Sequence, residues 1–421
     1  MANSIKRSPW LLGLTFVVIY LVNFFLAWPT TQWGDISNGS YLFGDFAWLS
    51  GWSTGCRVDL AFPHVFSVFS QIEATCPEFN YGTALIVLLS IFPIAWEYYI
   101  IAAITVGLMA VLALGYFLAR AYSMSFWQRV LVCLAFFSPG TYLLFERGNL
   151  DLLIILLIVI AALLLGRGAF FSSFFVLVFA TLIKFYALPL VIIVSLFSNT
   201  LKQRVFTTVL TLITFALVFV DYSRTQILSV YGPVQFGYPV LEHYFEWLGL
   251  SLRPIPSFIG FFAPLFVWAL LTLVDRRAGK GFQAMLRQSV TNLQADYAFL
   301  FTAIAFSAMF FVGLSFDYRL IFLAIAGIGL ILKSTFSRKL KAALWVLLMI
   351  ALWGSGAIGG KFMFIPDAIK PFLVGGFQLA GDLAVFLWVG ILLFFGSLVL
   401  ARKVGWIGRI LTFVTQYKPV G

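Results

Sequence analysis

The sequence has few charged residues, and this scarcity excludes most soluble proteins. Only 10% of the 421 residues are Asp, Glu, Lys or Arg, whereas 62% are hydrophobic and the mean hydropathy is +1.02. Apolar runs of about 15 to 25 residues recur along the chain, which is the pattern of an α-helical protein that crosses a membrane several times. We therefore expect an integral membrane protein.

Histidine and cysteine are also scarce, which leaves little material for a metal centre. The two histidines and three cysteines form no cluster at metal-ligand spacing, and the paired Asp motif of soluble sugar-nucleotide enzymes is absent. We predict no metal site and no cofactor. A divalent ion held by the carboxylates of the polar interval 28–97 is an alternative that no ligand pattern supports.

The apolar runs predict an all-α, polytopic fold in a single membrane domain that spans residues 1–421. The run 9–27 is too long and too aromatic for a signal peptide, so it is expected to be the first membrane helix. About twelve membrane helices are expected, some of them short or re-entrant. They lie near residues 9–27, 98–119, 130–145, 151–166, 169–183, 187–199, 205–220, 257–274, 297–314, 320–332, 342–357 and 378–400.

The placement of the charges predicts which side of the membrane each loop occupies. Lys6 and Arg7 put the amino terminus in the cytoplasm by the positive-inside rule. Alternation then puts 19 of the 27 basic residues inside and 14 of the 16 acidic residues at or near the outer side. The net charge of +11 is thus explained by topology, and no nucleic-acid partner is expected. Both termini are expected inside, and loops 28–97 and 221–256 outside.

Two short apolar stretches break the regular pattern of spans. Residues 83–95 are too short to cross comfortably and contain Pro93, so they are expected to form a helix at the outer interface, within the first loop. Residues 169–199 must hold two short helices, and the turn between them places Lys184 in the outer half of the membrane. A lysine there is a functional candidate because its desolvation is costly, whereas snorkelling to the interface is the alternative.

Cys56 and Cys76 share the first outer loop, which makes them the candidate disulfide. Two unpaired thiols are the alternative.

Four short motifs resemble those of a known enzyme superfamily. They are FNYG at 79–82, ERGNLD at 146–151, IKFYALP at 183–189 and SFDYR at 315–319, all predicted on the outer side. In this order they resemble the GT-C superfamily of glycosyltransferases that use polyprenyl-phosphate sugars, and most closely glycosyltransferase family 87, which includes mannosyltransferases of bacterial envelope glycolipids. The chain departs from that family where a Tyr-Pro-Pro-like element and a Lys-x-Tyr-Pro-like turn are usual.

The resemblance implies an inverting glycosyltransferase that takes a sugar, with a mannose-like hexose favoured, from a polyprenyl-phosphate carrier. The expected acceptor is an envelope glycolipid or glycan, and the expected location is a bacterial inner or plasma membrane with the active site outside the cytoplasm. Besides this donor and acceptor, membrane lipids are the expected partners.

The resemblance also implies that an aspartate of the first outer loop is the general base. Asp35 is the first candidate because a short, glycine-flanked tether joins it to the first helix, and Asp45 is the second. Asp59, Glu73 and Glu78 stay open as alternatives. The structural alternative for Asp35 and Asp45 is a helix N-cap.

Three cations at the predicted outer ends of helices are candidates for binding the donor phosphate: Lys184, Arg319 and Arg147. For Arg147 the alternative is an ion pair with Glu146 or Asp151, and for Arg319 an ion pair with Asp317. The candidates for sugar or acceptor binding are Asn149, Asp151, Tyr186, Asp317, Tyr318 and His243. Helix capping is the alternative for Asn149 and Asp151.

Two other functions remain open at this point. A secondary transporter or lipid flippase tends to show repeated halves and charges near the membrane midplane, and this sequence shows no internal repeat. A polysaccharide polymerase or ligase that uses a pyrophosphate-linked glycan usually has its large outer loop late in the chain, whereas here the longest loop comes first.

Overall fold

The computed structural model describes most of the apolar part of the chain. The described residues are 9–27, 85, 88, 98–139, 141, 144–145, 149–198, 200–224, 235–247, 254–294, 296–312, 315–316, 319–354 and 370–404. They form helices throughout, apart from one two-stranded antiparallel ladder.

The first half of the described chain contains α1 (Pro9–Ala27), α5 (Tyr99–Ala121), α6 (Phe126–Phe136), α8 (Asp151–Gly166), α9 (Phe170–Ile183), the 3-10 turn η3 (Phe185–Ala187), α10 (Leu188–Leu196) and α11 (Leu201–Arg224). The second half contains β1 (Gln235–Phe236), α12 (Val240–Trp247), α13 (Ile255–Arg277), α14 (Lys280–Gln294), α15 (Tyr297–Val312), β2 (Ser315–Phe316), α16 (Leu320–Lys333), α17 (Arg338–Trp353) and α18 (Lys370–Lys403).

Each of the expected membrane segments overlaps one of these helices, but the expected number of spans is not confirmed. In the described part of the chain, four helices are long and apolar enough to cross a membrane, or five if the bent pair α14–α15 counts as one span. The other apolar helices are shorter: α10 has 9 residues and α8 has 16, so they measure about 14 and 24 Å, less than a hydrocarbon core of about 30 Å. Hydropathy thus located the helices without showing which of them cross.

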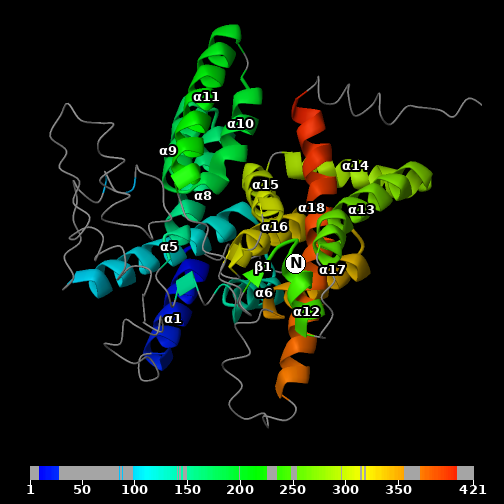
Figure 1. Cartoon of the computed structure of the whole chain (residues 1–421). Helices are drawn as coiled ribbons and strands as arrows, with labels where there is room; N and C mark the ends of the chain where they lie inside the picture. The colour runs from blue at the N-terminus through cyan, green and yellow to red at the C-terminus, as the bar shows by residue number, and fades with distance from the viewer. Residues whose placement is uncertain are drawn as a thin grey trace, which may run out of the picture.

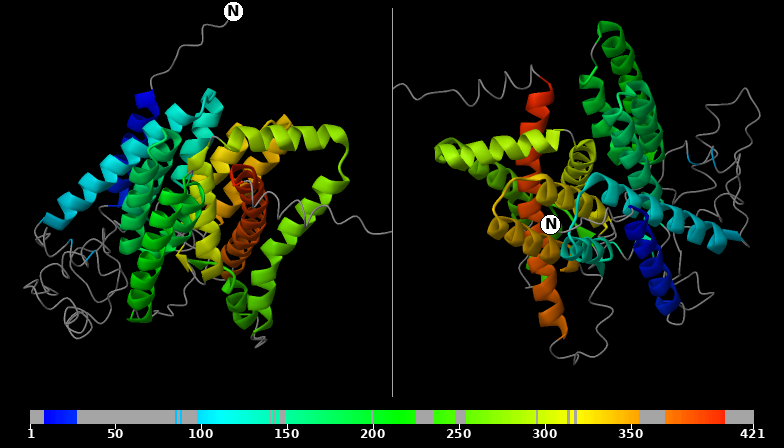
Figure 2. Two further views of the ribbon diagram at one scale, coloured as in Figure 1. Left: turned by 90° about the horizontal axis from the view of Figure 1, so that it is seen from above. Right: turned by 180° about the vertical axis from the view of Figure 1, so that it is seen from behind.

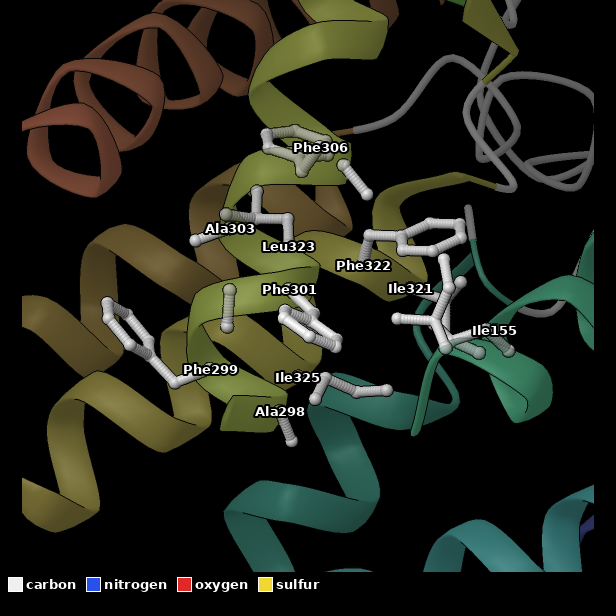
Figure 3. Close-up of a cluster of buried hydrophobic side chains, with 14 of the residues drawn as sticks. Ile155, Ala298, Phe299, Phe301, Ala303, Phe306, Ile321, Phe322, Leu323 and Ile325 are labelled. Carbon is white, nitrogen blue, oxygen red and sulfur yellow. The ribbon is translucent and has the colours of Figure 1, made fainter. Parts of the chain in front are cut away.

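The helices gather around α15, which packs against α8, α16 and α18 (Figure 1). Every described residue of α16 from Leu320 to Ile331 is buried, and so is most of α15. Figure 3 shows Phe301 and Phe306 of α15 packed with Phe322 and Leu323 of α16. A helix that is apolar on all sides must be covered on all sides, so α15 and α16 form the core of the bundle.

Helix α13 lies at the edge of the bundle and shows the opposite burial pattern. It packs against α18 and α12, while Phe258, Phe262 and Phe266 are exposed. Figure 2 shows α14 leading away from α13 across the end of α18. An apolar helix that exposes aromatic side chains outward suits a hydrocarbon environment, which agrees with a membrane protein.

Helices α17 and α18 approach each other closely at a pair of glycines. A Cβ added to Gly354 would lie 2.5 Å from the Cα of Gly381, so neither position has room for a methyl group. We expect Gly381→Ala to lower the free energy of unfolding by about 1–3 kcal/mol, because the two backbones must separate. Gly396→Ala on the same helix is the control, since no atom lies within 4 Å of its added Cβ. Thermal unfolding in detergent measures both variants, and equal midpoints would contradict the close contact.

Candidate functional site

Three of the motifs identified in the sequence meet at one carboxylate. Asp151 begins α8, Lys184 lies at the break between α9 and η3, and Arg319 immediately precedes α16. The Lys184 Nζ lies 2.6 Å from Asp151 Oδ1, and the Arg319 Nε lies 2.9 Å from Asp151 Oδ2. Two of the three cations predicted to bind a phosphate are therefore neighbours, because each contacts one oxygen of the same side chain.

Hydrogen bonds complete this cluster on the side of α8 and η3. The Tyr186 hydroxyl donates to Asp151 Oδ1 at 2.7 Å, and Lys184 Nζ donates to Asn149 Oδ1 at 3.4 Å. Asn149 Oδ1 also accepts from the backbone N–H of Asp151 at 2.8 Å. Asp151 thus accepts from three side chains, and both oxygens of its carboxylate are engaged.

Local backbone geometry explains why Lys184 reaches the cluster. Helix α9 ends at Ile183, and Lys184 takes an extended conformation with φ −141° and ψ 119°. The chain then resumes as η3 and as α10, where Pro189 stands in the first turn, a position that tolerates a residue without an N–H. The structure confirms that this segment holds two short helices with a break at Lys184.

The cluster is buried to different depths. The Asp151 side chain is 0% exposed, that of Lys184 8% and that of Arg319 20%. A buried carboxylate needs opposite charge and hydrogen bonds to offset its lost hydration, and here two cations and a tyrosine supply both. Arg319 is the most exposed of the three, so a ligand that enters the cluster meets this side chain most easily.

An aromatic contact holds Arg319 from a second direction. Its Cζ lies 5.4 Å from the centroid of the Tyr186 ring, a cation–π distance. The Tyr186 ring in turn meets Phe322 of α16 edge to face, with the centroids 5.8 Å apart. Phe322 belongs to the apolar core in Figure 3, so the polar cluster rests directly on that core.

The structure shows what some of the residues whose roles the sequence left open contact. Asn149 accepts a hydrogen bond from the backbone N–H of Asp151, the first residue of α8, whereas the Asp151 side chain is engaged in ion pairs. Arg319 pairs with Asp151, a partner 168 positions away that the sequence analysis did not consider for it.

Several predicted residues lie outside the part of the chain that the structure describes. They are Asp35, Asp45, Asp59, Glu73 and Glu78, the cysteines Cys56 and Cys76, the motif residues Arg147, Asp317 and Tyr318, the segment 79–82, and most of the interfacial segment 83–95. His243 falls within α12, but the position of its side chain is not among the described ones.

Asp382 is another buried carboxylate, and it was not among the residues predicted from the sequence. Asp382 on α18 is 6% exposed, and the Tyr244 hydroxyl of α12 donates to its Oδ2 at 2.6 Å. The signal was present, because Asp382 is an acidic residue inside the apolar run 378–400, and an ionisable side chain within such a run is a functional candidate.

Among the residues with described positions, no three His, Cys, Asp or Glu side chains gather as a set of metal ligands.

The comparisons with known proteins add no relative, since no family model, no curated protein and no solved structure matches this chain.

Proposed function

We propose that the protein is an inverting membrane glycosyltransferase that uses a polyprenyl-phosphate-linked sugar, with a mannose-like hexose favoured, at the extracytoplasmic face of a bacterial inner or plasma membrane. Its acceptor is an envelope glycolipid or glycan. In this proposal Lys184 and Arg319 bind the donor phosphate, and an aspartate of loop 28–97 acts as the base.

The observation that supports this proposal best is the meeting of Lys184 and Arg319 at Asp151. A lipid phosphate places its charge where apolar chain and water meet, so its binding site needs cations next to apolar surface. The cluster supplies the cations, and Phe185, the residue after Lys184, is an aromatic side chain that is 37% exposed. Asp151 and the Tyr186 ring hold the two cations before any ligand arrives, which reduces the ordering cost of binding.

The proposed reaction places one demand on each group. The acceptor hydroxyl attacks the anomeric carbon and passes its proton to the base, for which Asp35 is the first candidate. The bond between the anomeric carbon and the phosphate oxygen breaks, and polyprenyl phosphate leaves with the electron pair. Lys184 and Arg319 stabilise the negative charge that grows on that oxygen, as charged donors do at other phosphate sites.

The direct test is to incubate the purified full-length protein with radiolabelled undecaprenyl-phosphate mannose and octyl mannoside. We expect release of undecaprenyl phosphate and a labelled disaccharide, and we expect Asp35→Asn to abolish both because the base is lost. Asp45→Asn is the matched control. Full activity in Asp35→Asn would remove Asp35 from this role, and loss in Asp45→Asn alone would transfer the role to Asp45.

Two outcomes would replace the proposal itself. Turnover of a pyrophosphate-linked glycan, but of no monophosphate-linked sugar, would indicate a polysaccharide polymerase or ligase. Movement of the labelled lipid across proteoliposomes without bond cleavage would indicate a flippase.

A further inference from the structure

Asp382 lies in an unfavourable place for a carboxylate, within an apolar helix that is long enough to cross a membrane. Burial of such a group costs free energy unless its contacts offset it. One partner that the structure shows for it is Tyr244, which belongs to the segment 235–247 between α11 and α13. We call this segment, which contains β1 and α12, the strap.

The strap joins the α13–α18 side of the bundle to the candidate site. At its C-terminal end, Tyr244 bonds to Asp382 of α18, and Glu242 accepts a hydrogen bond from Ser257 of α13. In its middle, the carbonyl of Tyr238 lies against Gly260 of α13, where a side chain would collide with it. At its N-terminal end, Gln235 and Phe236 pair with Phe316 and Ser315 of β2.

Strand β2 is the link between the strap and Arg319. Phe316 precedes Arg319 by three residues, so only two residues of the chain separate β2 from the arginine. The C-terminal part of α15 contacts both the strap and α18. The Phe310 carbonyl accepts a hydrogen bond from the backbone N–H of Tyr238, and the Phe310 ring contacts that of Phe386 of α18, with the centroids 5.2 Å apart. Phe386 is one helical turn beyond Asp382, so Asp382 lies near the level at which α15 leads into β2.

We infer that Asp382 and Tyr244 are positioning residues: their hydrogen bond fixes the strap, the strap fixes β2, and β2 holds Arg319 against Asp151. Asp382 thus acts on the candidate site through this path and needs no contact with substrate. The predicted effect on ligand binding rests on the proposed function, whereas the mechanical link does not.

Hydrogen–deuterium exchange tests the mechanical link in the full-length protein in detergent. We expect Tyr244→Phe, which removes only the hydroxyl, to speed exchange in the peptides that contain β1 and β2 by about tenfold. Asp382→Asn should do the same. Ser397→Ala is the matched control, because Ser397 also joins α18 to a neighbouring helix, through the indole of Trp268 at 3.4 Å, but away from the strap. Unchanged exchange in both strap variants would overturn the inference.

A double-mutant cycle with Arg319 tests whether the path ends at this side chain. The readout is the equilibrium affinity for undecaprenyl phosphate in wild type, Asp382→Asn, Arg319→Gln and the double variant. We expect Asp382→Asn to weaken binding about tenfold in the presence of Arg319 and to have little further effect once Arg319 is replaced. Equal losses in both backgrounds would show that Asp382 acts through general stability, which would overturn the positioning role.

The two experiments separate the inference from the proposed function. If the wild-type protein does not bind undecaprenyl phosphate, the proposed phosphate site is wrong, and exchange at β1 and β2 still decides the strap. If it binds and exchange is unchanged in the strap variants, only the inference is wrong.

Discussion

Replacement of Asp151 by asparagine is expected to lower the free energy of unfolding by about 3–5 kcal/mol, because it leaves two cations next to a neutral group. The asparagine keeps the size of the side chain and an acceptor for the Tyr186 hydroxyl. It lacks the charge that offsets the lost hydration of Lys184, whose side chain is 8% exposed. Chemical or thermal unfolding in mild detergent measures the loss.

A second substitution shows whether the stranded charge is the cause. Asp151→Asn combined with Lys184→Met should recover part of the loss, since one of the two cations is gone and an apolar side chain of similar length takes its place. Asp275→Asn is the control for loss of a carboxylate that is less buried, and its effect should stay below about 1 kcal/mol. If Asp151→Asn unfolds like the wild type, the ion pairs do not stabilise the fold.

Replacement of Lys184 alone should weaken phosphate binding more than it destabilises the fold. In Lys184→Met, Asp151 still pairs with Arg319 and still accepts a hydrogen bond from Tyr186. The free energy of unfolding should therefore fall less than in Asp151→Asn. The affinity for undecaprenyl phosphate should fall about 10- to 100-fold, because a charged donor to the phosphate is removed. Isothermal titration measures the affinity, and the KM for the donor sugar should rise in parallel.

The exposed Lys202 near the start of α11 provides the control for the change of lysine to methionine. Lys202→Met should bind the phosphate as the wild type does, since it lies on the side predicted to be cytoplasmic. Lys184→Arg keeps the charge and should retain part of the affinity. Weakening by the same factor in Lys184→Met and Lys202→Met would show that the effect is one of overall charge, and Lys184 would then lose its proposed role.

The positions of the apolar helices were predictable because hydropathy is a local property of the chain, whereas α12 and α14, which carry many polar residues, were not predicted as helices. The break at Lys184 was predictable for the same reason: two apolar runs too short to span, with Pro189 at the start of the second, require a turn between them. The number of membrane crossings was not predictable in this way. Whether a helix as short as α10 crosses depends on what covers its ends and sides, and hydropathy does not contain that information.

The candidate site was predicted in its members but not in its arrangement. Lys184 and Arg319 were identified by type and by position at helix ends, Tyr186 by its place in the same motif as Lys184, and Asp151 by its place in the motif at 146–151. The shared carboxylate was not foreseen, because Asp151 meets Tyr186 across 35 positions and Arg319 across 168. The position of Asp382 inside an apolar run was a signal in the sequence, but its pairing with Tyr244 was not foreseeable, because 138 positions separate the two residues.

By itself the sequence predicted an all-helical membrane protein, the approximate positions of its apolar helices, and a short set of polar residues whose burial in apolar surroundings is costly. Only the tertiary structure decided which of those residues lie together. The physical reason is that the cost of burying a charge is a property of the residue and its apolar neighbours in sequence, whereas the contacts that offset this cost come from packing. For Asp151 these contacts come from Lys184, from Tyr186 of η3 and from Arg319 just before α16. Helix α15, part of the core shown in Figure 3, packs against α8, η3 and α16 and so brings these elements together.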